Sequence, residues 1–100
     1  MSLYQLIKLP KGHQKKYRIV TPEGKTITFG AQGYSDYPTH KDPDRQRRYL
    51  QRHKARENWT KSGLKTAGFW SRWILWNKPT LRESIQNTEQ KFKIKIKRKT

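Results

Sequence analysis

The sequence of 100 residues contains no cysteine, and this absence excludes disulfide bridges, cysteine-ligated zinc and thiol catalysis together. A reducing compartment fits that composition. The sequence also has no apolar run near the ~20 residues of a membrane-spanning helix, and its first residues are too weakly apolar for a signal peptide. We therefore expect no membrane span, and a protein of the cytoplasm or nucleus, or one carried inside a particle.

Acidic and aliphatic residues are both scarce. Seven Asp and Glu stand against 24 Lys and Arg, which gives a net charge of +17, and only 31% of the residues are hydrophobic. Self-repulsion at this charge opposes compaction unless an anionic partner neutralises it. Because each ring buries a large area, the aromatic residues must supply much of the core. Most of the few carboxylates lie at predicted caps and turns, so few residues are left to form the carboxylate pair of an acid–base enzyme. We therefore expect no enzyme.

The first third of the sequence predicts strands. Residues Leu3–Leu9 suit a short strand that ends at Pro10. Apolar residues with a period of two flank the turn Thr21–Lys25, which predicts a β-hairpin over residues 16–30. The glycines and the proline of the following segment, Gly30–Lys41, indicate a loop.

Helices are predicted in the second half. Asp42 before Pro43 is typical of a helix start, so we expect a helix over Pro43–Arg56. A second helix is expected from about Thr66, and the capping-box pattern from Thr80 to Glu83 predicts a short third one that fades near residue 87. On the second helix, the residues with inward-facing spacing are Phe69, Trp70, Trp73 and Ile74.

The segment KFKIKIKRK, residues 91–99, alternates apolar and cationic side chains and predicts a strand. This strand either joins the N-terminal sheet or pairs with another molecule. In the second case Phe92, Ile94 and Ile96 become contacts with a partner. The predicted fold is thus a single small α+β domain over residues 1–88, in which two or three short helices pack on a small antiparallel sheet. A lysine-rich, strand-like tail over residues 89–100 follows it.

Arginines recur along the first predicted helix at positions i, i+3, i+7 and i+11, and they form a cationic ridge. Such a ridge is either a solvated helix face or a surface for phosphates, which arginine forks match well. The whole-chain charge favours the second interpretation. No helix-turn-helix, zinc finger or RNA-recognition motif is visible, so we expect no readout of base sequence. The predicted polyanion- or partner-binding cations are Lys41, Arg45, Arg48, Arg52, Lys54, Arg56, Lys91, Lys93, Lys95, Lys97 and Arg98.

Two further residue groups have competing interpretations. The tryptophans suit core packing better than base stacking, but Trp59 in a loop and Trp76 off the inward stripe are predicted contacts with a partner. His40, Asp42, His53 and Glu57 invite a metal or nuclease interpretation, which we disfavour because Asp42 suits a cap and His53 a structural role. We predict no catalytic residue, metal, cofactor or small-molecule substrate.

The segment FGAQGYSDYPTHKDPDRQRRYLQRHKARENW, followed by TAGFWSRWILWNKPTLRESI, resembles an uncharacterised family of small basic proteins. Large nucleocytoplasmic DNA viruses, the giant viruses of algae and amoebae, encode this family. The resemblance covers about Phe29–Ile85 and is carried by YSDY, HKD, RH and ENW together with GFWSRW and LWNKPTL. It implies origin and context, since the family supplies no established catalytic or binding residues.

Two functions are therefore expected. The first is a non-enzymatic minor structural protein of a large double-stranded DNA virus particle, whose basic surface binds acidic patches of capsid proteins or packaged DNA. The second is a free protein that binds DNA or RNA without sequence specificity during viral replication, transcription or genome compaction. A steep dependence of affinity on salt is expected for the nucleic-acid partner.

Overall fold

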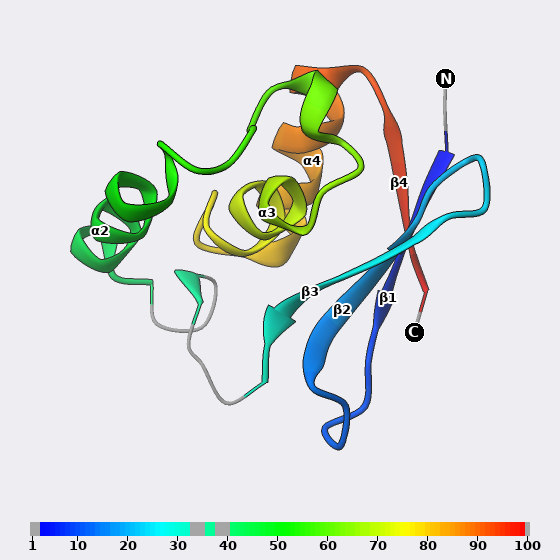
Figure 1. Cartoon of the computed structure of the whole chain (residues 1–100), viewed down its shortest axis with the longest axis horizontal. Coiled ribbons are helices and arrows are strands. Elements are labelled where there is room, and N and C mark those ends of the chain that lie inside the picture. Colours follow the sequence, from blue (N-terminus) through cyan, green and yellow to red (C-terminus); the bar gives the residue numbers. More distant parts are fainter. Residues whose placement is uncertain (1–2, 33–35, 38–40, 100) are drawn as a thin grey trace.

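A computed structural model of the chain describes residues 3–32, 36–37 and 41–99, and it places all of the longer helices on one side of a four-stranded sheet (Figure 1). This arrangement confirms the predicted α+β class. The elements in chain order are β1 (Leu3–Lys8), β2 (Lys15–Val20), β3 (Thr26–Ala31), α2 (Pro43–His53), a 3-10 turn (Lys61–Gly63), α3 (Ala67–Trp70) with a π-helical turn (Ser71–Leu75), α4 (Leu81–Phe92) and β4 (Lys95–Lys99).

The sheet has the strand order β3-β2-β1-β4. β1, β2 and β3 are antiparallel neighbours, as predicted. β4 is parallel to β1, with Tyr4 opposite Ile96, so the sheet is mixed and the expectation of a purely antiparallel sheet was wrong for this strand. A parallel neighbour needs a long connection that returns to the same end of the sheet, and the helices between β3 and β4 supply it.

The hairpin of β2 and β3 turns where the sequence predicts. Thr21 N–H donates to the Lys25 carbonyl (2.9 Å), and Gly24 adopts a φ of +89° in the turn. Gly30, near the end of β3, also has a positive φ, +76°. A Cβ there would lie 2.6 Å from Cδ1 of Leu75, so glycine lets the strand lie directly against the helical layer.

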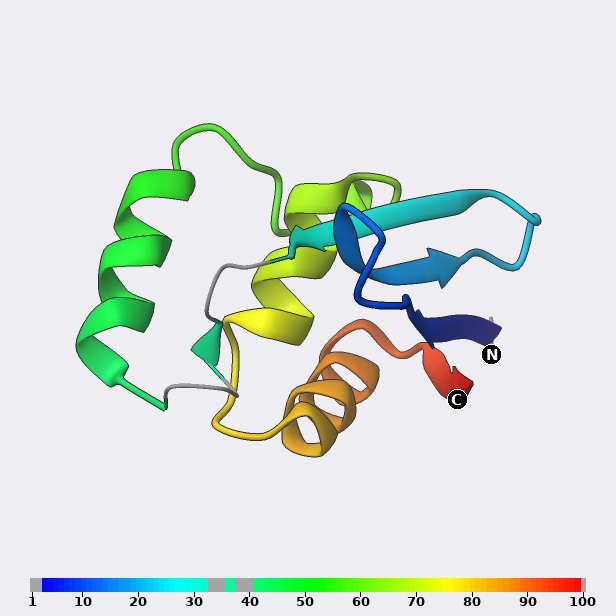
Figure 2. The same ribbon diagram turned by 90° about the horizontal axis from the view of Figure 1, so that it is seen from below.

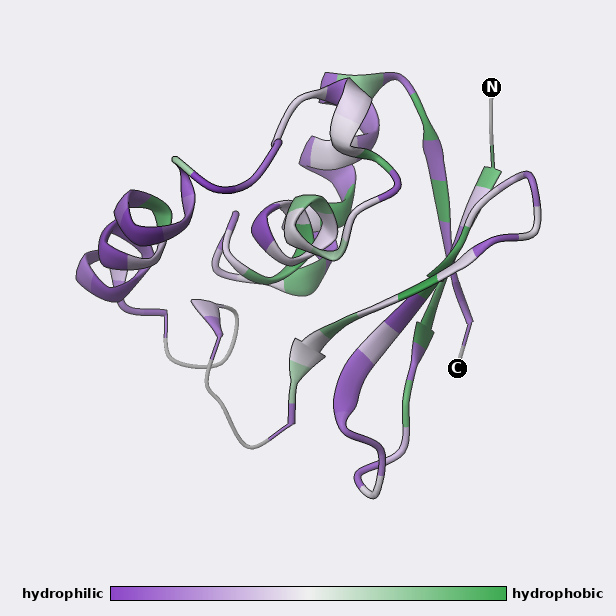
Figure 3. Ribbon diagram, viewed as in Figure 1, coloured by the Kyte–Doolittle hydropathy of each residue, from purple (hydrophilic) through white to green (hydrophobic). Residues whose placement is uncertain are grey.

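The core lies between the sheet and α3, its π-helical turn and α4 (Figure 3). The predicted inward stripe of the second helix is confirmed, because all four of its side chains are at most 8% exposed. Phe69 makes edge contacts with Trp70 at 5.0 Å and with Phe92 at 4.9 Å between ring centroids. Tyr4 of β1 meets Trp70 at 5.4 Å. Rings thus supply much of the packing, as the shortage of aliphatic residues requires.

The third predicted helix is longer than expected, because α4 continues to Phe92. The extension keeps a buried face of Ser84, Thr88 and Phe92 at four-residue spacing, and the Thr88 hydroxyl donates to the carbonyl of Ser84 (2.8 Å). Lys93, with a φ of +55°, ends the helix.

The expected separate tail belongs to the folded body. Its first residues complete α4, and β4 pairs with β1 of the same chain. Phe92, Ile94 and Ile96 are 7%, 4% and 7% exposed. They pack in the core, so the prediction that these three side chains contact a partner was wrong.

No helix among residues 3–32, 36–37 and 41–99 combines the length and the apolar character that crossing a membrane requires.

Candidate functional site

A cleft of about 580 Å³ lies between α2 and the packed body formed by the sheet and α3. This volume falls within the range of ligand-binding pockets. Figure 2 shows α2 standing at one side of the molecule, apart from the other helices. Five cationic side chains line the cleft: Lys15 and Lys16 of β2, and Arg45, Arg48 and Arg52 of α2, which we call the cleft arginines. Three arginines of the predicted ridge therefore border a concave surface.

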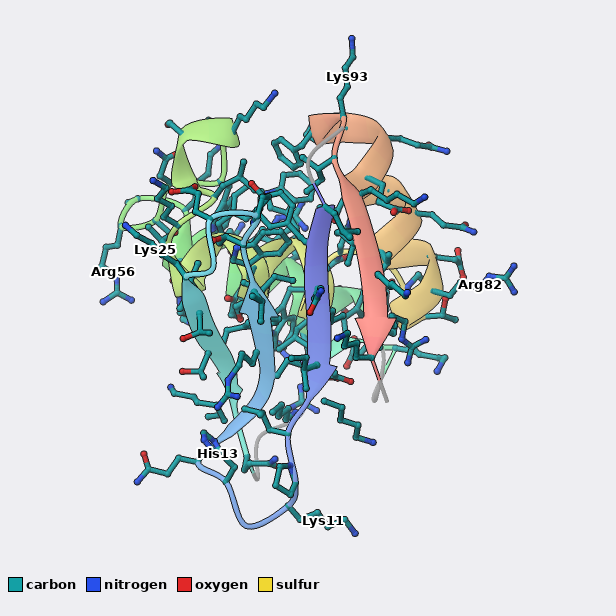
Figure 4. The ribbon with its side chains drawn as sticks, turned by 90° about the vertical axis from the view of Figure 1, so that its right-hand side faces the viewer. Lys11, His13, Lys25, Arg56, Arg82 and Lys93 are labelled. Atoms are coloured by element: carbon teal, nitrogen blue, oxygen red, sulfur yellow. The ribbon has the colours of Figure 1, made fainter. Side chains whose placement is uncertain are left out.

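The helix that carries the cleft arginines begins as predicted. The Asp42 side chain accepts hydrogen bonds from two backbone N–H groups of the first turn (2.9 and 3.4 Å), and Pro43 fills the first helical position. The helix ends at His53, three residues before the predicted end at Arg56. Arg56 therefore leaves the ridge, and Figure 4 shows its side chain pointing out into solvent.

The inner side of α2 is held by one aromatic stack and three polar contacts. The Tyr49 ring lies on the Trp76 ring, with centroids 4.3 Å apart and planes 5° from parallel. The Tyr49 hydroxyl lies 3.2 Å from Oγ of Ser71. Nε2 of Gln46 donates to the carbonyl oxygens of Trp76 (3.0 Å) and Asn77 (2.7 Å). These contacts set the rotation of the helix about its axis and so direct the cleft arginines.

Glu57 connects the end of α2 to the body. One of its carboxylate oxygens lies 2.9 Å from Nδ1 of His53, and the other accepts from the indole N–H of Trp59 at 2.9 Å. The His53 ring also stacks on Tyr49 with centroids 4.2 Å apart. A Cβ at Gly68 would lie 2.8 Å from Cδ of Glu57, so glycine gives the carboxylate room beside α3. These bonds explain His53 and Glu57 as structural residues.

The metal interpretation of the same region gains no support. His40 lies outside the described residues, and Asp42 serves as the helix cap. In the described part of the chain, no three His, Cys, Asp or Glu side chains come together as a metal-binding group.

The cleft has an excess of positive charge. Asp36 and Glu57 also line it, but Asp36 is paired with Nζ of Lys16 at 2.7 Å and Glu57 makes the bonds just given. No acidic side chain that the structure describes forms an ion pair with a cleft arginine, and all three arginines are exposed. Arg47, on another side of the helix, instead pairs with Asp44. The cleft can therefore hold an anion with several oxygen atoms, such as a phosphate group.

Burial affects the ionisation of two groups beside the cleft. It raises the pKa of the Tyr49 hydroxyl, against the effects of the Ser71 contact and of the nearby Arg72 and Arg52 charges. It lowers the pKa of Arg72, whose guanidinium lies over the Trp73 ring at 4.3 Å. The ring face compensates part of the cost of burying this charge.

The two tryptophans predicted to contact a partner have internal partners. Trp76 is stacked on Tyr49 and lines the cleft. Trp59 is half-buried, bonded to Glu57, and has Arg72 5.4 Å from its ring centroid. One ring face of each is therefore covered within the chain, and contact of either ring with a partner stays a prediction.

The other predicted cations fall into two groups. Lys41, Lys54 and Arg56 flank α2 outside the cleft lining and are exposed. The second group follows α4 into β4 on the far side of the body: Lys91, Lys93, Lys95, Lys97 and Arg98, all exposed. Lys91 lies 5.4 Å from the Trp73 ring centroid. The structure thus separates the predicted binding cations into groups on different parts of the molecule.

Sequence reasoning missed Lys15 and Lys16 as cleft residues. They begin a strand about thirty positions before the arginines, and no spacing rule links a strand end to a helix so distant in sequence. The only signal is the pair of adjacent cations where a strand begins. Their place in the cleft follows from the tertiary structure alone.

Comparison with known proteins gives one match. Residues 5–53 match the model of a family of unknown function (DUF5754). The matched segment contains most of β1, all of β2, β3 and α2, and all five cations of the cleft, whereas α3, α4 and β4 lie outside it. No curated protein and no solved structure matches the chain. The predicted membership of a family from giant viruses stays a prediction.

Proposed function

We propose that this protein binds nucleic acid through the phosphate backbone, without reading base sequence and without catalysis. The observation that carries this proposal is the cleft, where three exposed arginines have no acidic partner among the described residues. Seven carboxylates cannot neutralise 24 cations in any arrangement, so a counter-charge must come from elsewhere. Phosphates supply it and release their condensed counter-ions on binding.

Arginine is suited to this task. Its guanidinium stays charged at every relevant pH and offers a planar fork that matches two phosphate oxygens. The first and the last of the cleft arginines are seven residues apart on one helix (52 − 45 = 7), which places the three along ~10 Å of its axis. A row of this length can follow the backbone of one strand over a few phosphates.

The distribution of aromatic rings supports backbone contact over base stacking. Among the described residues, Leu3 is the large hydrophobic residue that is exposed, at 41%. Every described aromatic side chain is less exposed than this. Proteins that stack single-stranded bases present aromatic platforms at their surface. Because the rings here serve the core and the α2 stack, we propose equal affinity for different base sequences.

The proposal is tested by measuring affinity for a duplex of random sequence at several salt concentrations. Three phosphate contacts predict a slope of log affinity against log salt of about −2.7, and more contacts make it steeper. We expect Arg45→Gln, Arg48→Gln and Arg52→Gln together to weaken the tightest binding by roughly tenfold and to reduce the slope, because fewer phosphates are neutralised.

A charge-matched control separates the cleft from net charge. Lys11, Lys25 and Lys78 are exposed lysines in connecting segments, and their replacement by glutamine also removes three charges. We expect this control triple variant to bind much more tightly than the cleft triple variant. A flat salt slope for the unaltered protein, or equal losses in both triple variants, would contradict the proposal.

We propose the particle or the infected cell of a large DNA virus as the setting. A minor structural role in the virion, in contact with packaged DNA or acidic capsid proteins, agrees with the charge and with the sequence resemblance. Because Phe92, Ile94 and Ile96 are buried in the core of this chain, they no longer support the pairing of β4 with another protein of the particle. Nucleic acid therefore stands as the proposed partner, and detection of the protein in purified particles would test the setting.

A further inference from the structure

A second cationic surface lies on the outer face of the sheet. Side chains alternate across a strand, and Ile96 points into the core, so Lys95, Lys97 and Lys99 lie on the outer face. We call these three residues the outer-face lysines. They stand beside Leu3, Gln5 and Ile7 of β1 in the parallel register. The longer helices all pack on the other side of the sheet, and Figure 4 shows the outer face turned toward the viewer without any helix over it.

This surface carries positive charge without compensation from its own strands. None of the four strands contains an aspartate or a glutamate. Glu89 reaches β4 from α4, but its carboxylate accepts the backbone N–H of Ile96 at 2.8 Å. Arg18 of β2, opposite Ile7, adds a fourth cation to the same face. The lysines repeat every ~6.7 Å along the strand, a spacing similar to that of successive phosphates in one nucleic-acid strand.

The two cationic surfaces face different directions. The cleft lies on the helical side, beside α2, and the outer-face lysines lie across the sheet from it (Figures 1 and 4). The molecule is 35 Å long on its longest axis. A duplex that touched both surfaces would have to turn around this body, and even a bend of 40–90° costs roughly 1–6 kcal/mol. Two separate segments can occupy the two surfaces with no bending.

From this geometry we infer that one molecule binds two segments of nucleic acid at once and so bridges them. The inference rests on the proposed function and adds a second surface to it. The cleft is the tighter site because its arginines form forked contacts within a concave surface, whereas lysines act as single point charges. A bridging protein of this kind gathers a long polyanion into a compact mass.

Bridging is tested with two duplexes of random sequence, one on beads and one labelled with a fluorophore. The full chain should retain the labelled duplex on the beads. The ratio of protein to DNA is kept low enough that part of each duplex stays unoccupied by protein. Lys95→Gln, Lys97→Gln and Lys99→Gln together should keep duplex binding within about threefold but lower the retained label roughly tenfold. The cleft triple variant should also lose bridging, while the control triple variant keeps it.

Two further measurements keep the result interpretable. Thermal unfolding of the outer-face variant, together with a variant carrying arginine at the same three positions, separates loss of charge from loss of fold, because the arginine variant should bridge. Light scattering in the absence of DNA should show a monomer. The inference is overturned if the outer-face variant still bridges the two duplexes. It is also overturned if bridging requires a protein dimer. Duplex binding without bridging overturns the inference alone, whereas absence of all binding also overturns the proposed function.

Discussion

α2 and α3 differ in how they are attached to the molecule. α3 has four residues and buries two of them, Phe69 and Trp70, without any measurable exposure. α2 has eleven residues and buries one, Tyr49. Figure 3 shows the same contrast, with a mostly hydrophilic α2. Stability and the proposed binding therefore depend on different parts of this chain: the body carries the apolar burial, and α2 carries cations that the core does not need.

The largest effect is expected from removing a ring of the body. Trp70→Ala deletes a fully buried side chain that contacts Tyr4 and Phe69 and whose indole N–H donates to the Leu64 carbonyl at 2.8 Å. Such a truncation costs about 3–5 kcal/mol, which is a large part of the ~5–15 kcal/mol that stabilises a typical domain. Urea unfolding followed by circular dichroism should show a midpoint at a much lower urea concentration than that of the unaltered protein. A loss below 1 kcal/mol would mean that the body does not carry the stability.

A smaller and local effect is expected from releasing α2. Tyr49→Ala removes the stack on Trp76 and on His53 but leaves the sheet and its core contacts in place. The global free energy of unfolding should fall by only about 1–2 kcal/mol, because few apolar contacts join the helix to the body. Native-state hydrogen exchange should show lost protection in α2 and retained protection in β1 and β2.

The control for this experiment lies on the same helix. Arg47→Ala changes an exposed residue paired with Asp44 and should leave the exchange of α2 nearly unaltered. Equal loss of protection in α2 and in β1 after Tyr49→Ala would show that the two regions unfold as one unit.

The smallest effect concerns alkaline pH. Burial raises the pKa of Tyr49 in the folded state above the value of about 10 in the unfolded chain. A raised folded pKa contributes stability that is complete below the unfolded pKa and is lost as the pH rises through the folded pKa. Tyr4 and Tyr17, whose pKa values burial also raises, add to the same loss. The urea midpoint should therefore fall above pH 10.

Tyr49→Phe isolates the share of one group. Its urea midpoint should decline less steeply than that of the unaltered protein between pH 9 and pH 11, because only the other tyrosines titrate. Identical declines of the urea midpoint in the two proteins would show that burial does not raise the pKa of the Tyr49 hydroxyl. That result would argue against the Tyr49 ring as the contact that holds α2 on the body.

Much of the fold follows from local patterns in the sequence. Asp42 and Pro43 mark the start of α2, and the inward spacing from Phe69 to Ile74 identifies the second helix, because caps and periodicity depend on neighbours in sequence. The direction of β4 could not be predicted, since both directions bury the same alternating isoleucines. The end of α4 was also missed, because Phe92 reads equally well as the first residue of an alternating strand.

The candidate site was predictable only in part. The arginine ridge follows from helical spacing, and three of its four members stay together in the structure. Its surroundings do not follow, because Lys15 and Lys16 reach the cleft through the tertiary fold. The sequence likewise treats all exposed cations alike, although the sheet separates the cleft arginines from the outer-face lysines.

The pairing of β4 with β1 bears on how the chain is made. Leu3 lies beside Lys95, 95 − 3 = 92 positions later, so β1 can pair with β2 early but with β4 only after that long intervening segment has been synthesised. Contacts between such distant positions slow the search for the native state, since a long loop must close first. During that interval the edge of β1 has unpaired backbone groups with which another chain could form a strand pair. Once β4 has paired there, it forms the new edge of the sheet, and its lysines oppose edge-to-edge association with another chain.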